Sequence, residues 1–215
     1  INPKRILTNS FSGGQPIGFG LMQRDTNFDH YQDFQARYGR RPSAWVEPKS
    51  DWGAGHVELF QFPTVNEYSD NIGAYWVPEK SYKPGEALHF EYSLSWCSPI
   101  HRKPLLAIVN STRILRKEKD VRFIIDFQSD RKKKSLFKKD LTADIQVLNG
   151  YRLLSSQIIE NPVSKGLRLV IHVRFDKKGF LDEIIPDELP AIDLIAFIKD
   201  KDKQITETWS YTYLP

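Results

Sequence analysis

The chain of 215 residues is 40% hydrophobic and 27% charged, the composition of an ordinary globular protein with one large core or two smaller ones. No stretch approaches the roughly 18 consecutive apolar residues of a membrane span, so the sequence excludes a transmembrane helix. The net charge of +4 comes entirely from residues 104–215, which carry 20 Lys and Arg against 16 Asp and Glu, whereas residues 1–103 carry 11 of each.

Helical spacing occurs at one place in the first half of the chain. Phe28, Tyr31 and Phe34 recur at intervals of three, behind Asn27, a residue type that favours the start of a helix. The pattern predicts a short helix that ends near Gly39.

Strands are predicted for the rest of the regular structure in this half. Apolar and polar residues alternate over 57–62 and again over 88–96, and each alternation predicts a strand with one buried face. Trp96, at the end of the second strand, is therefore expected to pack into a core. Residues 83–86, Lys-Pro-Gly-Glu, have the composition of a turn between the two strands.

Residues 99–104 are predicted to be a linker between two domains, 1–98 and 105–215. Two prolines and a basic pair interrupt the alternation there. The short alternating segments that follow predict seven strands, with 167–175 the most buried: 105–115, 121–128, 143–149, 151–159, 167–175, 190–199 and 205–213. Such a series is typical of an immunoglobulin-type β-sandwich, although the cysteine pair of antibody domains is absent.

Six basic residues lie close together at 131–134 and 138–139. A patch of this kind can bind nucleic acid or an anionic surface. Acids flank the run at Asp130 and Asp140, which favours a solvated loop between strands. No nucleic-acid partner is expected.

Aromatic and hydrogen-bonding residues are interspersed between Gly20 and Trp76, where Trp45 and Trp52 stand among acids, amides and arginines. Proteins bind sugars by stacking the C–H face of a pyranose on an aromatic ring and by pairing its hydroxyls with carboxylates, amides and guanidinium groups. The stretch therefore fits a carbohydrate site. The alternative is that the aromatic residues simply fill a β-core.

Other chemistries have less support. The five histidines are scattered, Cys97 is the only cysteine and forms no internal disulfide, and no metal-binding motif is present, so no metal or cofactor is expected. No Gly-x-Ser-x-Gly segment indicates a serine nucleophile, although a Ser-His-Asp site assembled in space stays open. Residues 18–20 (Gly-Phe-Gly) and 53–55 (Gly-Ala-Gly) belong to no βαβ unit and are interpreted as turns or close backbone approaches.

Asp70 is the strongest candidate for a catalytic acid. It lies in a polar segment that is predicted to be a turn between a strand ending at Phe62 and another that holds Trp76. Catalytic acids are usually presented on such loops. Nearby aromatic rings would desolvate the carboxyl and keep it protonated, as a general acid requires. The alternative is a turn aspartate that caps its own backbone.

Several sequence blocks follow one another along the whole chain. In the first half they are GFGLMQRD at 18–25, Phe28, Tyr31, RPSAWV at 41–46, DWGAG at 51–55, Pro63-Thr64, DNI at 70–72 and WVP at 76–78. The second half adds NPVSKGLRL at 161–169 and ETWSY at 207–211. This succession resembles the periplasmic glucan biosynthesis proteins G and D of Gram-negative bacteria, and the D member more than the G member.

The resemblance implies a fold and an activity. Family members have a large galactose-mutarotase-like β-sandwich with a glucan-binding cleft, followed by an immunoglobulin-like domain. Residues 1–98 are thus expected to be the C-terminal part of that sandwich, in an all-β protein. Members are exported to the periplasm, serve the synthesis of osmoregulated periplasmic glucans and are regarded as inverting β-1,2-glucanases. A non-catalytic glucan-binding or assembly protein is the alternative.

The resemblance also places the general acid on Asp70 and the base-side carboxylate upstream of Ile1. Because its block is polar and bounded by glycines, Trp52 is expected to line the cleft and not the core. The expected partner is a β-1,2-linked glucan, without a cofactor; a homodimer and contact with the membrane glucan-synthesis machinery stay open. Glucan contacts are expected from Arg24, Asp25, Tyr31, Arg41, Asp51, Trp52, Glu67 and Asn71.

Overall fold

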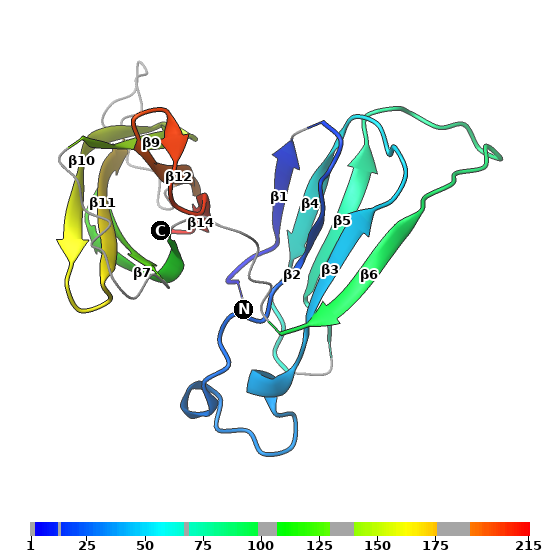
Figure 1. Cartoon of the computed structure of the whole chain (residues 1–215), viewed down its shortest axis with the longest axis horizontal. Helices are drawn as coiled ribbons and strands as arrows, with labels where there is room; N and C mark the ends of the chain where they lie inside the picture. The colour runs from blue at the N-terminus through cyan, green and yellow to red at the C-terminus, as the bar shows by residue number, and fades with distance from the viewer. Residues whose placement is uncertain (1–2, 13, 67–68, 99–106, 130–139, 176–189) are drawn as a thin grey trace. The chain divides into compact units, whose positions relative to one another are not determined.

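A computed structural model describes residues 3–12, 14–66, 69–98, 107–129, 140–175 and 190–215 (Figure 1). The protein is all-β apart from two short 3₁₀ turns in this described part. The chain divides into two compact units, Ile1–His101 and Arg102–Pro215. The predicted linker at 99–104 lies outside the described residues.

The first unit contains two three-stranded antiparallel sheets, and the predicted strand at 57–62 falls on β4. One sheet has the order β1-β4-β5, with β1 at Leu7–Ser12, β4 at Gly55–Gln61 and β5 at Ile72–Pro78. The other has the order β2-β3-β6, with β2 at Phe19–Leu21, β3 at Ser43–Pro48 and β6 at Tyr92–Cys97.

Glycines mark the places where these strands approach most closely. A Cβ on Gly20 would overlap the backbone carbonyl of Ala44, and a Cβ on Gly55 would overlap that of Val77. Gly53 adopts a φ of +76° in the turn before β4, a conformation that favours glycine. The interpretation of these glycines as turns and close backbone approaches is confirmed.

The predicted helix over 27–39 is wrong. The segment instead contains two 3₁₀ turns, η1 at Phe28–His30 and η2 at Tyr38–Arg40. Between them, Asp33 Oδ1 accepts hydrogen bonds from the backbone N–H groups of Gln35 (2.8 Å) and Ala36 (2.7 Å). Such local bonds compete with helical ones. Gln32 and Arg37 also have positive φ angles, which end the helical geometry.

Two tryptophans are placed opposite to expectation. Trp52 is only 9% exposed, and the rings of Phe19, Trp76, Phe90 and Tyr92 surround it at centroid distances of 5.1–6.4 Å. Trp96 is 67% exposed on β6. The prediction that Trp52 lies outside the core and Trp96 inside it is therefore wrong.

Predicted strand 88–96 also differs, because regular pairing begins only at Tyr92, where β6 meets Pro48 of β3. Its alternating apolar residues are exposed, not buried. Trp52 is the one buried apolar residue in the described part of this unit, whereas its exposed large apolar residues include Phe11, Phe34 and Leu94. These sheets therefore enclose little core of their own.

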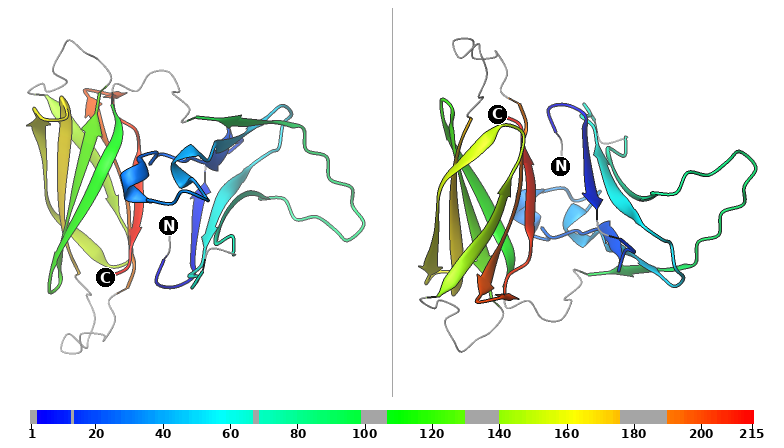
Figure 2. Two further views of the ribbon diagram at one scale, coloured as in Figure 1. Left: turned by 90° about the horizontal axis from the view of Figure 1, so that it is seen from below. Right: turned by 90° about the horizontal axis from the view of Figure 1, so that it is seen from above.

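The second unit is a two-sheet sandwich, as predicted (Figure 2). Its first sheet has the order β10-β11-β8-β7, with β7 at Ile108–Lys117, β8 at Asp120–Gln128, β10 at Tyr151–Asn161 and β11 at Gly166–Phe175. Its second sheet is built around β12 at Ile192–Asp200, which pairs with β9 at Leu141–Val147, β13 at Lys203–Gln204 and β14 at Trp209–Tyr213. The predicted strand at 205–213 is thus shorter than expected, because regular strand pairing begins only at Trp209.

The core of the second unit comes from strict alternation on three central strands. Alternate residues of β8, β11 and β12 face one another between the sheets and are almost completely buried. Residues 167–175 were predicted to form the most buried strand, and four alternate positions of β11 indeed have no exposed surface: Leu167, Leu169, Ile171 and Val173. β8 equals it, since its four inward apolar residues also have no exposed surface: Val121, Phe123, Ile125 and Phe127.

Candidate functional site

Asp70 and Asn71 lie in the loop that joins β4 to β5. The Asn71 amide donates to the Phe62 carbonyl oxygen (3.1 Å), and the Phe62 backbone N–H donates to the Asn71 carbonyl oxygen (3.0 Å). These two bonds close the base of the loop and fix the point from which Asp70 projects. Asp70 is exposed, so the expectation that aromatic rings desolvate its carboxyl is wrong for the described residues. Glu67 lies outside them.

Asp25 and Tyr31 belong to a hydrogen-bonded loop between β2 and β3. The Asp25 carbonyl oxygen accepts from the Gln23 amide (2.8 Å) and the Tyr31 hydroxyl (3.2 Å). The Gln23 backbone N–H in turn donates to the hydroxyl of Ser43 (3.0 Å), which is fully buried at the start of β3. The loop is therefore anchored to the sheet at Gln23.

His30 is a member of this loop that the sequence did not single out. Its Nδ1 lies 2.7 Å from Asp25 Oδ2, and the Asn27 amide lies 3.3 Å from its Nε2. The hydrogen bond to His30, with help from the Asn27 backbone N–H, lowers the pKa of Asp25. Asp25 thus orients the imidazole of His30 in the loop that also carries Tyr31, and the loop offers both donors and acceptors to a ligand.

Tyr31 and Arg41 come together on the ring of Tyr38. The two tyrosine rings lie 5.7 Å apart, and the Arg41 guanidinium lies 4.9 Å from the centre of the Tyr38 ring. Arg24, next to Asp25, is exposed. Four of the predicted glucan-contacting residues therefore lie in one loop region, 24–41.

Asp51 and Trp52 occupy the turn between β3 and β4. Asp51 Oδ1 accepts from the Gly53 backbone N–H (2.8 Å), and Gln15 Oε1 accepts from the Trp52 N–H (2.8 Å). An open hollow of about 520 Å³ lies at this turn; its lining is Asp51, Trp52, Gly53, Ala54, Pro78, Glu79, Lys80 and Tyr82. Trp52 thus supplies one wall of a hollow while its ring is mostly packed.

The predicted site residues fall into two groups at opposite ends of β4. Asp51 and Trp52 precede the strand, and Asp70 and Asn71 follow it. A seven-residue strand spans roughly 20 Å at its usual rise per residue. Figure 1 shows loop 24–42 at the same end of the strands as the β4–β5 loop. The two groups are too far apart to hold a single sugar unit.

A polar sheet face connects the two ends. In the register of β1, β4 and β5, Ser10, Glu58 and Tyr75 lie directly opposite one another and share a face. The Tyr75 hydroxyl donates to Glu58 Oε1, and His56 Nε2 lies 3.7 Å from Glu58 Oε2. That hydrogen bond to Glu58 raises the pKa of Tyr75. The alternation of 57–62 could have shown that His56 and Glu58 share this face.

Within the described ranges, no group of three or more His, Cys, Asp and Glu side chains is arranged to hold a metal ion. A search of the same residues finds no helix with the length and apolar character needed to cross a membrane.

This is an all-β protein whose first unit carries aromatic, carboxylate, amide and hydroxyl groups along one sheet. Residues 1–213 match the model of the family described as periplasmic glucan biosynthesis protein, MdoG, and the chain belongs to this family. Membership implies a role in periplasmic glucan biosynthesis.

Among solved structures, a marsupial T cell receptor matches at 12% identity and a TM-score of 0.25. The match covers 80% of this chain and 43% of the receptor chain, and it is too weak to bear on fold or function.

Proposed function

We propose that the first unit binds an extended β-1,2-linked glucan along β4, from the hollow beside Trp52 to the loop that carries Asp70. The separation of the two residue groups by the length of β4 is the observation that supports this proposal, because several linked sugars are needed to reach both. The polar row of Ser10, Glu58 and Tyr75 lies between them and offers hydroxyl-binding groups.

We propose that Asp70 is the general acid for cleavage of the glucosidic bond with inversion. A closed loop base formed by Phe62 and Asn71 supports this role, because a general acid needs a fixed position beside the leaving oxygen. Inversion also needs a base that activates water, with the two carboxyls roughly 6.5–9.5 Å apart. Asp51 does not fit, since it lies at the far end of β4.

The first experiment measures glucan binding to the purified chain as a function of glucan length, with linear β-1,2-glucans. Affinity should rise steeply until the glucan spans both ends of β4 and then level off. Asp51→Ala should remove the increase in affinity with glucan length and leave the affinity for short glucans unchanged. Equal affinity for short and long glucans would contradict the extended binding mode.

The second experiment measures reducing-sugar release by the same chain. The base is expected outside these residues, and general base catalysis contributes roughly 10²–10⁴-fold, so hydrolysis should be negligible. In any longer form of the protein that hydrolyses the glucan, Asp70→Asn should abolish turnover while binding persists. Unchanged turnover would exclude Asp70 as the acid and favour the alternative, a glucan-binding protein that assists backbone synthesis by contact.

A further inference from the structure

The two outer faces of the second unit carry different charge. On the outward face of the β10-β11-β8-β7 sheet, alternation places six cations and two acids: Arg113, Lys117, Arg122, Arg152, Arg168 and Arg174, with Asp120 and Asp126. On the outward face of the β9-β12-β14 sheet it places Asp144, Asp193 and Lys199. One face is therefore strongly basic and the other slightly acidic.

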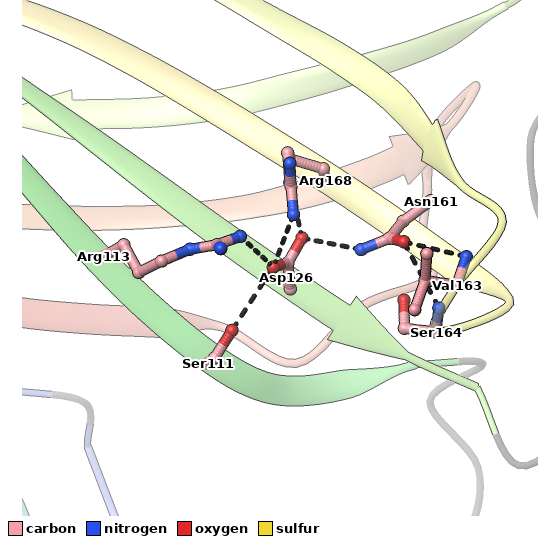
Figure 3. A network of polar contacts seen from close by, with 7 residues as sticks. All are labelled: Ser111, Arg113, Asp126, Asn161, Val163, Ser164 and Arg168. Carbon is pink, nitrogen blue, oxygen red and sulfur yellow. Dashed lines mark hydrogen bonds and ion pairs between the residues drawn. The ribbon is translucent and has the colours of Figure 1, made fainter.

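Both acids of the basic face are already neutralised by its own arginines. Asp126 accepts two bonds from Arg168 (2.7 and 2.9 Å) and one from Arg113 (2.8 Å), as Figure 3 shows. Asp120 accepts two bonds from Arg174 (2.7 and 2.8 Å). The side chain of Asp126 is only 7% exposed, whereas that of Arg113 is 56% exposed. Asp126 is thus covered, Asp120 is paired but 29% exposed, and the guanidinium groups of Arg113 and Arg174 reach solvent.

Further cations on this face have no internal counter-ion. Arg122 is the third residue of β8, is exposed and forms no ion pair with a described residue. Lys117, at the end of β7, is likewise exposed and without an ion pair in the described part of the chain. Their charge is available to an external partner.

Apolar side chains accompany these cations. Leu115 lies directly opposite Arg122 across the β7–β8 pair, and Ile159 lies directly opposite Arg168 across the β10–β11 pair. Both are exposed. A flat surface that mixes guanidinium groups with exposed aliphatic side chains suits an interface in which phosphate groups lie beside hydrocarbon.

We propose that this basic face binds the anionic headgroups of a phospholipid surface. A four-stranded face of this length presents roughly 500 Å², which is below the roughly 800 Å² per partner of a stable protein complex. Binding to a charged bilayer does not require a contact area of that size, because each basic residue near the membrane surface contributes separately to the binding free energy. The inference does not depend on glucan binding, which is assigned to the other unit.

The test is co-sedimentation of the purified chain with vesicles of phosphatidylcholine alone or mixed with phosphatidylglycerol. The chain should bind only the mixed vesicles, and an increase in salt from about 0.1 to 0.5 M should release it. Arg122→Glu and Lys117→Glu should each lower the partition coefficient about tenfold or more. Lys203→Glu makes the same charge change on the opposite sheet and should have little effect; thermal melts check that all three variants fold.

Three results would overturn the proposal: equal binding to both kinds of vesicle, no binding to either, or an equal loss in Lys203→Glu. Binding to soluble polyglutamate without binding to the mixed vesicles would also overturn it, and would point to an acidic protein as the partner.

Discussion

Replacement of Asp126 by Ala should destabilise the second unit strongly, because one buried carboxylate accepts hydrogen bonds from five donor groups on three other strands: β7, β10 and β11. Besides the arginines, the Asn161 amide (2.9 Å) and the Ser111 hydroxyl (3.3 Å) donate to it. Loss of one partner from a fully buried ion pair costs about 3–5 kcal/mol. Arg168 is 34% exposed and can regain water, so we expect about 2–4 kcal/mol, or a fall in Tm of about 10 °C.

Asp120 provides a matched control. It lies on the same strand and accepts the same paired bonds from Arg174, but both side chains are much more exposed. Asp120→Ala should therefore change the melting temperature far less, because water screens the pair and replaces its hydrogen bonds. Thermal unfolding followed by circular dichroism measures both variants. Equal losses would refute the argument that burial gives the Asp126 network its strength.

Three further predictions concern pH, the first unit and the domain boundary. Burial tends to raise the pKa of Asp126, but hydrogen bonds from Arg168 and Asn161 outweigh this effect, and the pKa lies below its ordinary 3.8. The stability difference between wild type and Asp126→Ala should therefore persist above about pH 4 and shrink below it. A constant difference from about pH 2 to 7 would contradict this expectation. In a denaturant titration, Trp52→Ala should destabilise the first unit by about 3 kcal/mol through loss of ring packing, whereas Trp96→Ala should be nearly neutral. Similar effects of the two substitutions would show that the difference in burial is unimportant. Limited trypsin digestion should cut first within 97–105 or 130–140, where basic residues lie outside the predicted strands. Early cleavage within 167–175 would contradict the domain assignment.

The sequence predicted the second unit well because the alternation of apolar residues along its strands matches the alternation of buried positions. On β8, β11 and β12, apolar residues recur at every second position, and those positions are the ones that face the opposite sheet. Strand alternation is a local signal, and here the tertiary structure reinforces it.

Prediction failed where non-local contacts decide burial. The Trp96 segment has regular alternation, but burial of its face depends on a covering layer that the described residues do not provide. Trp52 lies in a polar, glycine-bounded turn, yet four rings from three distant segments close around it. Near Asp33, helical spacing was present, but side-chain bonds to the backbone favoured another conformation.

The candidate site was predicted only in its parts. The sequence brought forward Asp70 and the residues of loop 24–41, but it does not show that β4 separates them from Asp51 and Trp52. Nothing in the sequence distinguishes Glu58 from the other acids between Gly20 and Trp76. Its half-buried position between His56 and Tyr75 depends on strand register, which one sequence does not reveal.

The unequal burial of the two units has a consequence for hydrogen exchange. Amides of β8, β11 and β12 have paired strands on both sides and a dry core beneath them, so they should exchange with deuterium only when the whole second unit unfolds. Among the described residues of the first unit, β6 has a neighbouring strand on one side only and little buried surface, so its amides should exchange through small local openings. One chain would then show two protection regimes, and its heat denaturation would not follow a single two-state transition.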